Sequence, residues 1–134
     1  MRRVALAALL LATACNGDPG ENAGRPCAGL LRSPDPSVTL PVPAGLDGLV
    51  VYELQKQGST NRYNAQLATG DDVVAVRNRI LDAFAADGFT IDSLDEEPPA
   101  EAEFGWTKDD KEGSVQVTPV CHRTVHVRYR VGPR

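Results

Sequence analysis

The most constraining feature of this 134-residue chain is the strict alternation of its last segment, residues 124–131. Every second side chain there is apolar, and the side chains between them are hydrogen-bonding or charged. Successive side chains of a strand point to opposite faces, so the pattern predicts a strand with one buried and one polar face. Such a strand fits an antiparallel sheet that is covered on one side only. The covered side should hold Val125, Val127, Tyr129 and Val131, and the other side Thr124, His126, Arg128 and Arg130.

The cover for this sheet is predicted to be a helix between residues 69 and 88. Thr69 stands three residues before Asp72, the capping-box arrangement that begins a helix. Apolar side chains then recur at helical spacing, and Gly88 supplies the left-handed residue past the end. We expect an amphipathic helix of about sixteen residues. Its apolar stripe is formed by Val73, Val76, Ile80 and Phe84.

Other short segments have the composition or alternation of strands. They lie at residues 49–54 and 63–67 before the helix, and at 89–91, 103–107 and 114–120 after it. The predicted fold is α+β, a single antiparallel sheet of about five strands in the order β-β-α-β-β-β, with one helix packed on one face. This order is similar to that of many small exported bacterial domains of unassigned function, and it implies no specific chemistry.

The chain has the length of one domain and a short leader. Residues 15–26 contain no large apolar side chain, which indicates a flexible tether rather than part of a core. Residues 27–134 are predicted to form a single α+β domain of a common size. Beyond the leader, no stretch approaches the ~18 apolar residues that a membrane span needs.

The leader has the three parts of an export signal: two arginines, an apolar run of eleven residues, and small residues before Cys15. Its end, residues 11–15, resembles the lipobox of bacterial lipoproteins, in which the cysteine after the cleavage site receives a diacylglycerol. The resemblance covers the leader alone, and Ala12 stands where leucine is most usual. It implies that residues 1–14 are a signal peptide and that Cys15 is the lipid attachment point, on the extracytoplasmic side of the membrane.

Plain secretion is the alternative, because residues 12–14 also form an ordinary A-x-A cleavage site. The cysteine count favours the lipoprotein, since a secreted chain with three cysteines would have one thiol left over. With Cys15 acylated, Cys27 and Cys121 make one disulfide, as is common outside the cytoplasm. Two reduced thiols are the alternative for this pair.

The sequence contains no convincing catalytic constellation. His122 and His126 lie beside Cys121, but on a strand the two histidines are roughly 13 Å apart, too far to share one metal ion. No serine has a G-x-S-x-G or S-x-x-K setting, and no glycine-rich phosphate loop is present. We therefore expect no catalytic residue, no metal and no cofactor, and a protein that is not an enzyme.

Charge is distributed unevenly along the chain. Residues 92–112 carry nine acidic and two basic side chains, whereas residues 123–134 carry four arginines and no acid. One interpretation is ion pairing between neighbouring strands, which is common at surfaces and contributes little to stability. That interpretation pairs Glu101 or Glu103 with Arg128 or Arg130.

The other interpretation is a binding face formed by His126, Arg128 and Arg130, directed at anionic lipid headgroups or an acidic partner. Removal of the leader takes away two arginines and leaves 12 basic against 18 acidic side chains, a formal charge of −6. Net acidity argues against a nucleic-acid binder that works by bulk charge. An anionic membrane surface would also repel the domain.

The sequence thus predicts a non-enzymatic lipoprotein of the cell envelope that presents one side of its sheet to a protein partner. The alternative is a small envelope enzyme or ligand-binding protein. Its site would lie between the sheet face and the loops at residues 55–62 and 95–101, in a pocket with a buried titratable group.

The lipid anchor has a direct test. Replacing Cys15 with alanine removes the thiol that accepts the lipid, so the protein should move from the membrane pellet to the medium. Fractionation of cells and medium measures the change. Thr13→Ala, which keeps the cysteine and a small residue before it, is the matched control and should stay in the pellet. Continued membrane association of the Cys15→Ala protein would contradict the anchor.

Overall fold

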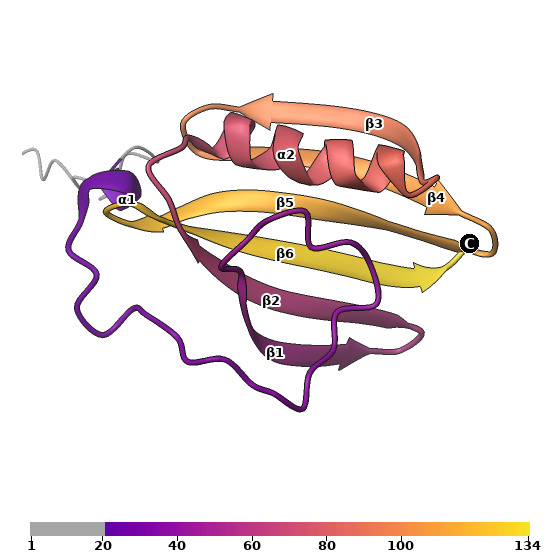
Figure 1. The fold of residues 1–134 in the computed structure, drawn as a ribbon, viewed down its shortest axis with the longest axis horizontal. Helices are drawn as coiled ribbons and strands as arrows, with labels where there is room; N and C mark the ends of the chain where they lie inside the picture. Colours follow the sequence, from indigo (N-terminus) through magenta and orange to yellow (C-terminus); the bar gives the residue numbers. More distant parts are fainter. Residues whose placement is uncertain (1–20) are drawn as a thin grey trace, which may run out of the picture.

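The structure of this protein is a computed structural model and describes residues 21–134. The predicted signal peptide and the lipid attachment at Cys15 lie outside these residues. The described chain forms one antiparallel sheet of six strands with a single long helix packed on one face (Figure 1). The predicted α+β class and the helix-covered sheet are confirmed, and the sheet has six strands where about five were predicted. Four strands follow the long helix, whereas the predicted order β-β-α-β-β-β placed three there.

The elements follow one another with short connections after residue 50. A helical turn, α1 (Glu21–Gly24), lies in the segment predicted as a tether. The first hairpin is β1 (Val50–Gln57) and β2 (Thr60–Ala68), and the long helix α2 (Val73–Ala86) follows it. The remaining strands are β3 (Thr90–Glu97), β4 (Glu101–Lys108), β5 (Lys111–Cys121) and β6 (Thr124–Pro133).

Strand β3 extends into a segment that the sequence predicted to be an acidic loop. The predicted strand at residues 89–91 is only its beginning, and pairing with β4 continues to Glu97. Every residue of β3 except Ile91 is exposed, so the strand has no apolar alternation. A hydrophobic pattern does not reveal such a strand, because backbone pairing with its neighbour holds it in place.

The long helix begins three residues later than predicted. Asp72 is its N-cap, and the Oδ1 of Asp72 accepts a hydrogen bond from the Ala75 N–H at 2.8 Å. The Oγ1 of Thr69 instead accepts from the Asp71 N–H at 3.0 Å, so the prediction that Thr69 caps the helix is wrong. The helix end is as predicted, because Gly88 adopts φ +83° directly after it.

The sheet order is β1-β2-β6-β5-β4-β3, and every neighbouring pair is antiparallel. Strands β2 and β3 therefore run in the same direction with three strands between them. Helix α2 connects them by crossing over the sheet (Figure 1). A helix in this position covers the β4 and β5 half of one face and leaves the β1 and β2 half open.

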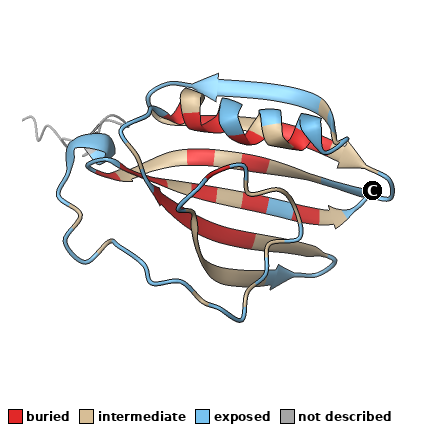
Figure 2. Cartoon of the chain, in the orientation of Figure 1, coloured by how far each residue is buried: buried red, intermediate tan, exposed pale blue. Residues whose placement is uncertain are grey.

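The apolar stripe of α2 and one face of the sheet form the core (Figure 2). The four predicted stripe residues are buried, and so are the four alternating apolar residues of β6. The Phe84 ring contacts the rings of Phe104 and Trp106, with centroids 5.2 and 5.7 Å away. Burial of a side chain of this size contributes roughly 1.5–3 kcal/mol, so these rings hold the helix on the sheet.

The proline-rich segment before β1 covers the other half of the core face. The sequence predicted an irregular lead-in here, and residues 33–47 indeed contain no helix or strand. The segment packs apolar side chains on the core, and its Ala44 carbonyl accepts a hydrogen bond from the Tyr129 hydroxyl at 3.0 Å. Gly45, with φ +74°, lies so close to α2 that a Cβ would stand 2.9 Å from the Ile80 Cα. The apolar side chains with which this segment contacts the core are Val38, Leu40, Val42 and Leu46.

A disulfide ties the N-terminal segment to one end of the sheet. Cys27 and Cys121 are bonded, with Cα atoms 5.1 Å apart, at the end of β5. Next to it, the Arg25 Nε donates to the Val120 carbonyl at 2.6 Å, and the His122 N–H donates to the Arg25 carbonyl at 2.8 Å. The N-terminal segment is thereby held at the β5–β6 turn. Within residues 21–134, no helix is long and apolar enough to cross a membrane.

Candidate functional site

The face of the sheet opposite α2 carries polar side chains on every strand. The pairing registers align one residue from each strand in a row across the sheet, and a second row lies beside it. In the described chain no helix covers these rows, and residues 30–32 cross one corner, where their backbone bonds to Gln66. We call this surface the polar face. Its first row is Asp95, Glu103, Gln116, Arg128, Asn64 and Glu53, and its second is Ser93, Gly105, Ser114, Arg130, Arg62 and Gln55.

The three residues predicted to bind a partner all lie on the polar face. Arg128 and Arg130 belong to its two rows, and His126 lies beside the first row on the same strand. Their exposure differs: Arg130 is exposed, whereas Arg128 and His126 are partly buried among their neighbours. The sheet thus brings the predicted residues together, and β6 places them at its middle.

His126 is held in a hydrogen-bonded chain that leaves it neutral. The Asn64 Nδ2 donates to Glu53 Oε2 at 2.8 Å, so the Asn64 Oδ1 accepts from the His126 Nε2 at 3.1 Å. Burial, with a smaller effect from Arg128, lowers the pKa of His126 to about 4, although Glu53 acts in the opposite direction. The ring carries no charge at neutral pH, so the cationic part of the face consists of arginines.

The expected ion pairs between β4 and β6 do not form, because β5 lies between these strands. An amide bridges the gap instead: Arg128 Nη1 donates to Gln116 Oε1 at 3.4 Å, and Gln116 Nε2 donates to Glu101 Oε2 at 3.0 Å. Within the described residues, Arg128, Arg130, Glu101 and Glu103 make no ion pair shorter than 4.0 Å. Their charges therefore remain separate, the acids on β4 and the arginines on β6.

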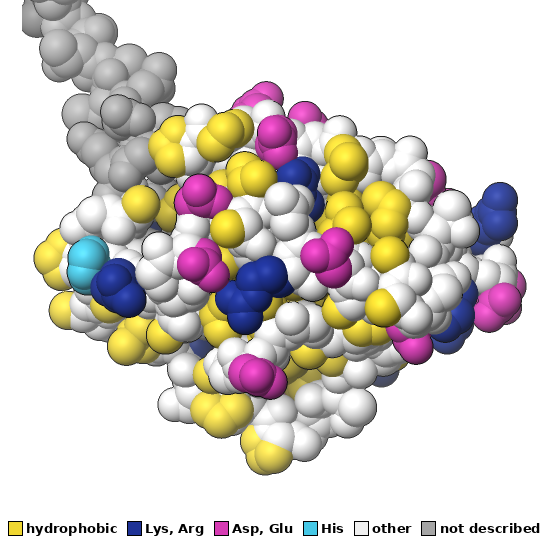
Figure 3. Space-filling view, turned by 45° about the horizontal axis from the view of Figure 1, so that its top comes forward, with side chains coloured by type: hydrophobic (Ala, Val, Ile, Leu, Met, Phe, Trp, Pro, Cys, Tyr) yellow, Lys and Arg dark blue, Asp and Glu magenta, His cyan; other side chains and the backbone are white. Residues whose placement is uncertain are grey.

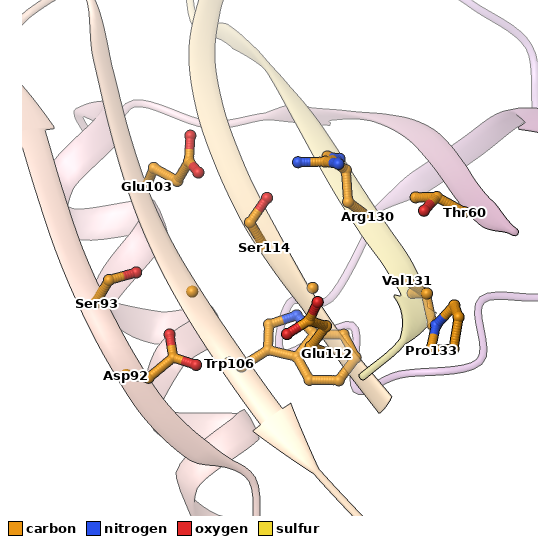
Figure 4. Close-up of a pocket in the computed structure, with 13 residues that line it drawn as sticks. Thr60, Asp92, Ser93, Glu103, Trp106, Glu112, Ser114, Arg130, Val131 and Pro133 are labelled. Atoms are coloured by element: carbon orange, nitrogen blue, oxygen red, sulfur yellow. The ribbon is translucent and has the colours of Figure 1, made fainter. Parts of the chain in front are cut away.

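A hollow of about 280 Å³ opens in the polar face between β3 and β6 (Figure 4). Gly105 of the second row lines it, and the Asp92 and Ser93 side chains occupy the space where a side chain on that glycine would lie. Gly113 also lines it, at a place where a Cβ would overlap the Arg130 carbonyl oxygen. The polar side chains around the hollow are Thr60, Asp92, Ser93, Glu103, Glu112, Ser114 and Arg130.

The rim of the hollow is predominantly acidic. Burial raises the pKa of Glu103, and the neighbouring carboxylates of Glu101 and Asp95 act in the same direction, whereas the Ser114 hydroxyl and the Arg130 guanidinium act in the opposite direction. A carboxylate under these conditions is stabilised by a cation that approaches it. The arrangement therefore suits an ammonium or guanidinium group from outside, with the Ser93 and Ser114 hydroxyls as additional hydrogen-bonding groups.

Charges on the other side of the molecule are not separated in this way. Figure 3 brings the β3 and α2 side forward, and acidic and basic side chains there are interspersed among apolar ones. On α2 the exposed Arg79 pairs with Asp71 at 3.0 Å. The separation of charge is a property of the polar face.

The remaining candidate residues take structural positions. Cys121 is consumed by the disulfide, and His122 is exposed in the turn after it. Within residues 21–134, no three His, Cys, Asp or Glu side chains are placed to hold a metal ion.

Three residues of the polar face, Asn64, Gln116 and Gly105, were not predicted from the sequence. The alternation that buries Tyr63 and Ala65 was a signal for Asn64, whereas the roles of Gln116 and Gly105 depend on the strand order. No family model, curated protein or solved structure matches the chain.

The low pKa of His126 predicts a pH-dependent stability. The folded value of about 4 lies below the ordinary 6.5, so the unfolded chain binds the proton first as pH falls. The neutral His126 ring therefore contributes to the free energy of unfolding, and this contribution is complete above pH 6.5 and is lost as pH falls toward 4. Between pH 7 and 5, the free energy of unfolding should fall by about 1 kcal/mol more in the natural chain than in His126→Gln, because the partly exposed ring realises only part of the shift. Urea unfolding at both pH values measures it, and equal losses in the two proteins would contradict the assignment.

Proposed function

We propose that this chain is a lipoprotein of the cell envelope, held outside the cytoplasmic membrane through Cys15, whose polar face binds a protein partner without catalysing a reaction. The observation that carries the proposal is the polar face itself: a sheet surface that spans six strands, lies free of any described helix, and separates acidic from basic side chains. Surfaces with such charge patterns select partners and fix their orientation.

The position of the chain entry supports this arrangement. The disulfide and Arg25 hold the N-terminal segment at the β5–β6 turn, so a lipid-bearing tether reaches the domain at this end of the sheet. The strands extend from that end away from the membrane, so the polar face would be roughly perpendicular to the membrane surface and open to neighbouring proteins. With a formal charge of −6 after removal of the leader, the domain is repelled by anionic lipid. A protein is therefore the favoured partner.

The alternative of a small-ligand or catalytic site is less well supported. Of the two loops expected to frame such a site, residues 55–62 contribute Thr60 to the hollow, and residues 95–101 contribute no lining residue. The hollow is open to solvent, and seven of its thirteen lining residues have charged or hydroxyl side chains (Figure 4). Sites for small molecules are typically more enclosed and more apolar.

A crosslinking experiment in intact cells tests the proposal. A photoreactive amino acid at Ser114, in the middle of the polar face, should form a defined crosslinked species after illumination. The same amino acid at Ala85, which is exposed on α2, is the matched control and should give none. Mass spectrometry then identifies the captured chain. No specific product at Ser114, or equal products at both positions, would contradict binding through the polar face.

A further inference from the structure

The polar face has two halves of opposite charge. On one side, β3 and β4 contribute carboxylates, with Asp95 and Glu103 in the first row. On the other side, β6 and β2 contribute arginines, with Arg128 in the first row and Arg130 and Arg62 in the second. Strand β5 lies between the two halves, and in these rows it carries only the neutral Gln116 and Ser114. A surface of this kind is complementary to itself.

We infer that the partner of the polar face is a second copy of this chain, stacked face to face about a two-fold axis that runs along β5. The inference rests on the proposed function and gives its partner a chemical identity. A two-fold axis parallel to the strands keeps each residue at its level along the strand and reverses the order of the strands. It therefore places β6 of one copy over β4 of the other. In such an interface every contact occurs twice.

The aligned rows determine which residues meet. Glu103, Gln116 and Arg128 share one level, so Arg128 of each copy faces Glu103 of the other, with the two Gln116 side chains on the axis. Two sheets that pack in alignment keep their strand directions within roughly 30° of each other, which preserves this correspondence. The other in-plane axis, perpendicular to the strands, would place acid over acid and is disfavoured by repulsion.

The hollow receives the second arginine. Gly105, Ser114 and Arg130 share the second level, so the same axis brings Arg130 of one copy over Gly105 of the other. Gly105 lines the hollow of about 280 Å³, together with Asp92, whose carboxylate lies beside this glycine. Arg130 is exposed, and within the described chain its side chain makes no hydrogen bond or ion pair. Its guanidinium is thus available for carboxylates of the second copy.

The overlapping area and the chain entry are compatible with this dimer. Centred on β5, the overlap covers β2, β6, β5, β4 and β3, roughly 650 Å² of sheet at ordinary strand spacings, close to the ~800 Å² per partner of a standard interface. It leaves out β1. Residues 30–32 cross β2 at Gln66, so the contact on β2 lies toward its other end, at Arg62 and Asn64. An axis parallel to the strands also puts both disulfide ends on the same side, so two tethers reach one membrane.

The charge of the whole domain limits the strength of the dimer. Two copies of formal charge −6 repel one another at long range, so the paired charges must offset this repulsion. We expect dissociation in the micromolar range in solution. Attachment to one membrane raises the local concentration of copies and favours the dimer there.

Analytical ultracentrifugation with charge-reversal variants tests the inference, on whole mature protein that carries Cys15→Ala so that it stays free of lipid. The unchanged face should give a monomer–dimer equilibrium. Arg128→Glu alone, or Glu103→Arg alone, should weaken the dimer by at least roughly 100-fold, since each change acts twice. Both changes in one chain restore the complementarity and should recover the affinity to within about tenfold. Arg79→Glu, on exposed α2, is the matched control and should have no effect.

A cysteine on the axis gives a second readout. Sheets that stack face to face lie roughly 10 Å apart, too far for a direct disulfide but within reach of a short bifunctional maleimide. The reagent should therefore link two Gln116→Cys copies, and Arg128→Glu in the same chain should abolish the link. A protein that stays monomeric up to ~1 mM, or a dimer that is unaffected by Arg128→Glu while circular dichroism shows a folded chain, overturns the inference. If Ser114 captures a different protein in cells while the chain stays monomeric, the second-copy inference fails and the proposed binding function stands.

Discussion

The two-residue period of the strands is the constraint on which the rest of this structure depends. Each strand that gives one side chain to the core gives the next to the opposite face. Helix α2 and the proline-rich segment cover one face, and their contacts with Phe104, Trp106 and Tyr129 fix which side is buried. The side chains between the buried ones must then lie on the second face, and in this chain most of them are polar. The polar face thus consists of the side chains that alternate with the core.

The local part of this arrangement could be predicted from the sequence. The alternation of β6 identified both faces of that strand correctly, and helical spacing identified the buried stripe of α2. These patterns are local, because the direction of each side chain depends on its position within its own strand or helix. The pairing of Cys27 with Cys121 could be expected from cysteine parity, and the structure contains that disulfide.

The long-range part could not be predicted, because no local pattern encodes the strand order. With β5 between β4 and β6, Gln116 bridges Glu101 and Arg128, and the expected direct ion pairs are absent from the described chain. Most of strand β3 was missed for a related reason, because only its beginning at residues 89–91 was predicted. Its carboxylates are typical of a loop, but its backbone pairs with β4, and the buried Arg77 guanidinium binds Glu96 at 2.6 Å and the Asp95 carbonyl at 3.2 Å.

Neutral side chains keep the acidic and basic groups of the polar face apart. Direct pairing of the acids and arginines would cancel most of the surface field, but the amides of Gln116 and Asn64 form hydrogen bonds with neighbouring charged groups while keeping them apart. His126 stays neutral in the same network and adds no charge to either half. The acidic and basic halves of the polar face therefore remain available to charged groups of a partner.

The central claim is that the polar face is covered by a partner in the cell envelope. The most direct measurement is the rate at which a membrane-impermeant maleimide modifies a cysteine placed at Ser114, compared with one at Ala85 on exposed α2. In dilute purified protein both thiols should react readily. In intact cells the thiol at position 114 should react several-fold more slowly than in solution, while the thiol at position 85 keeps its rate. Equal rates in cells and in solution at position 114 would show an uncovered face and contradict the account.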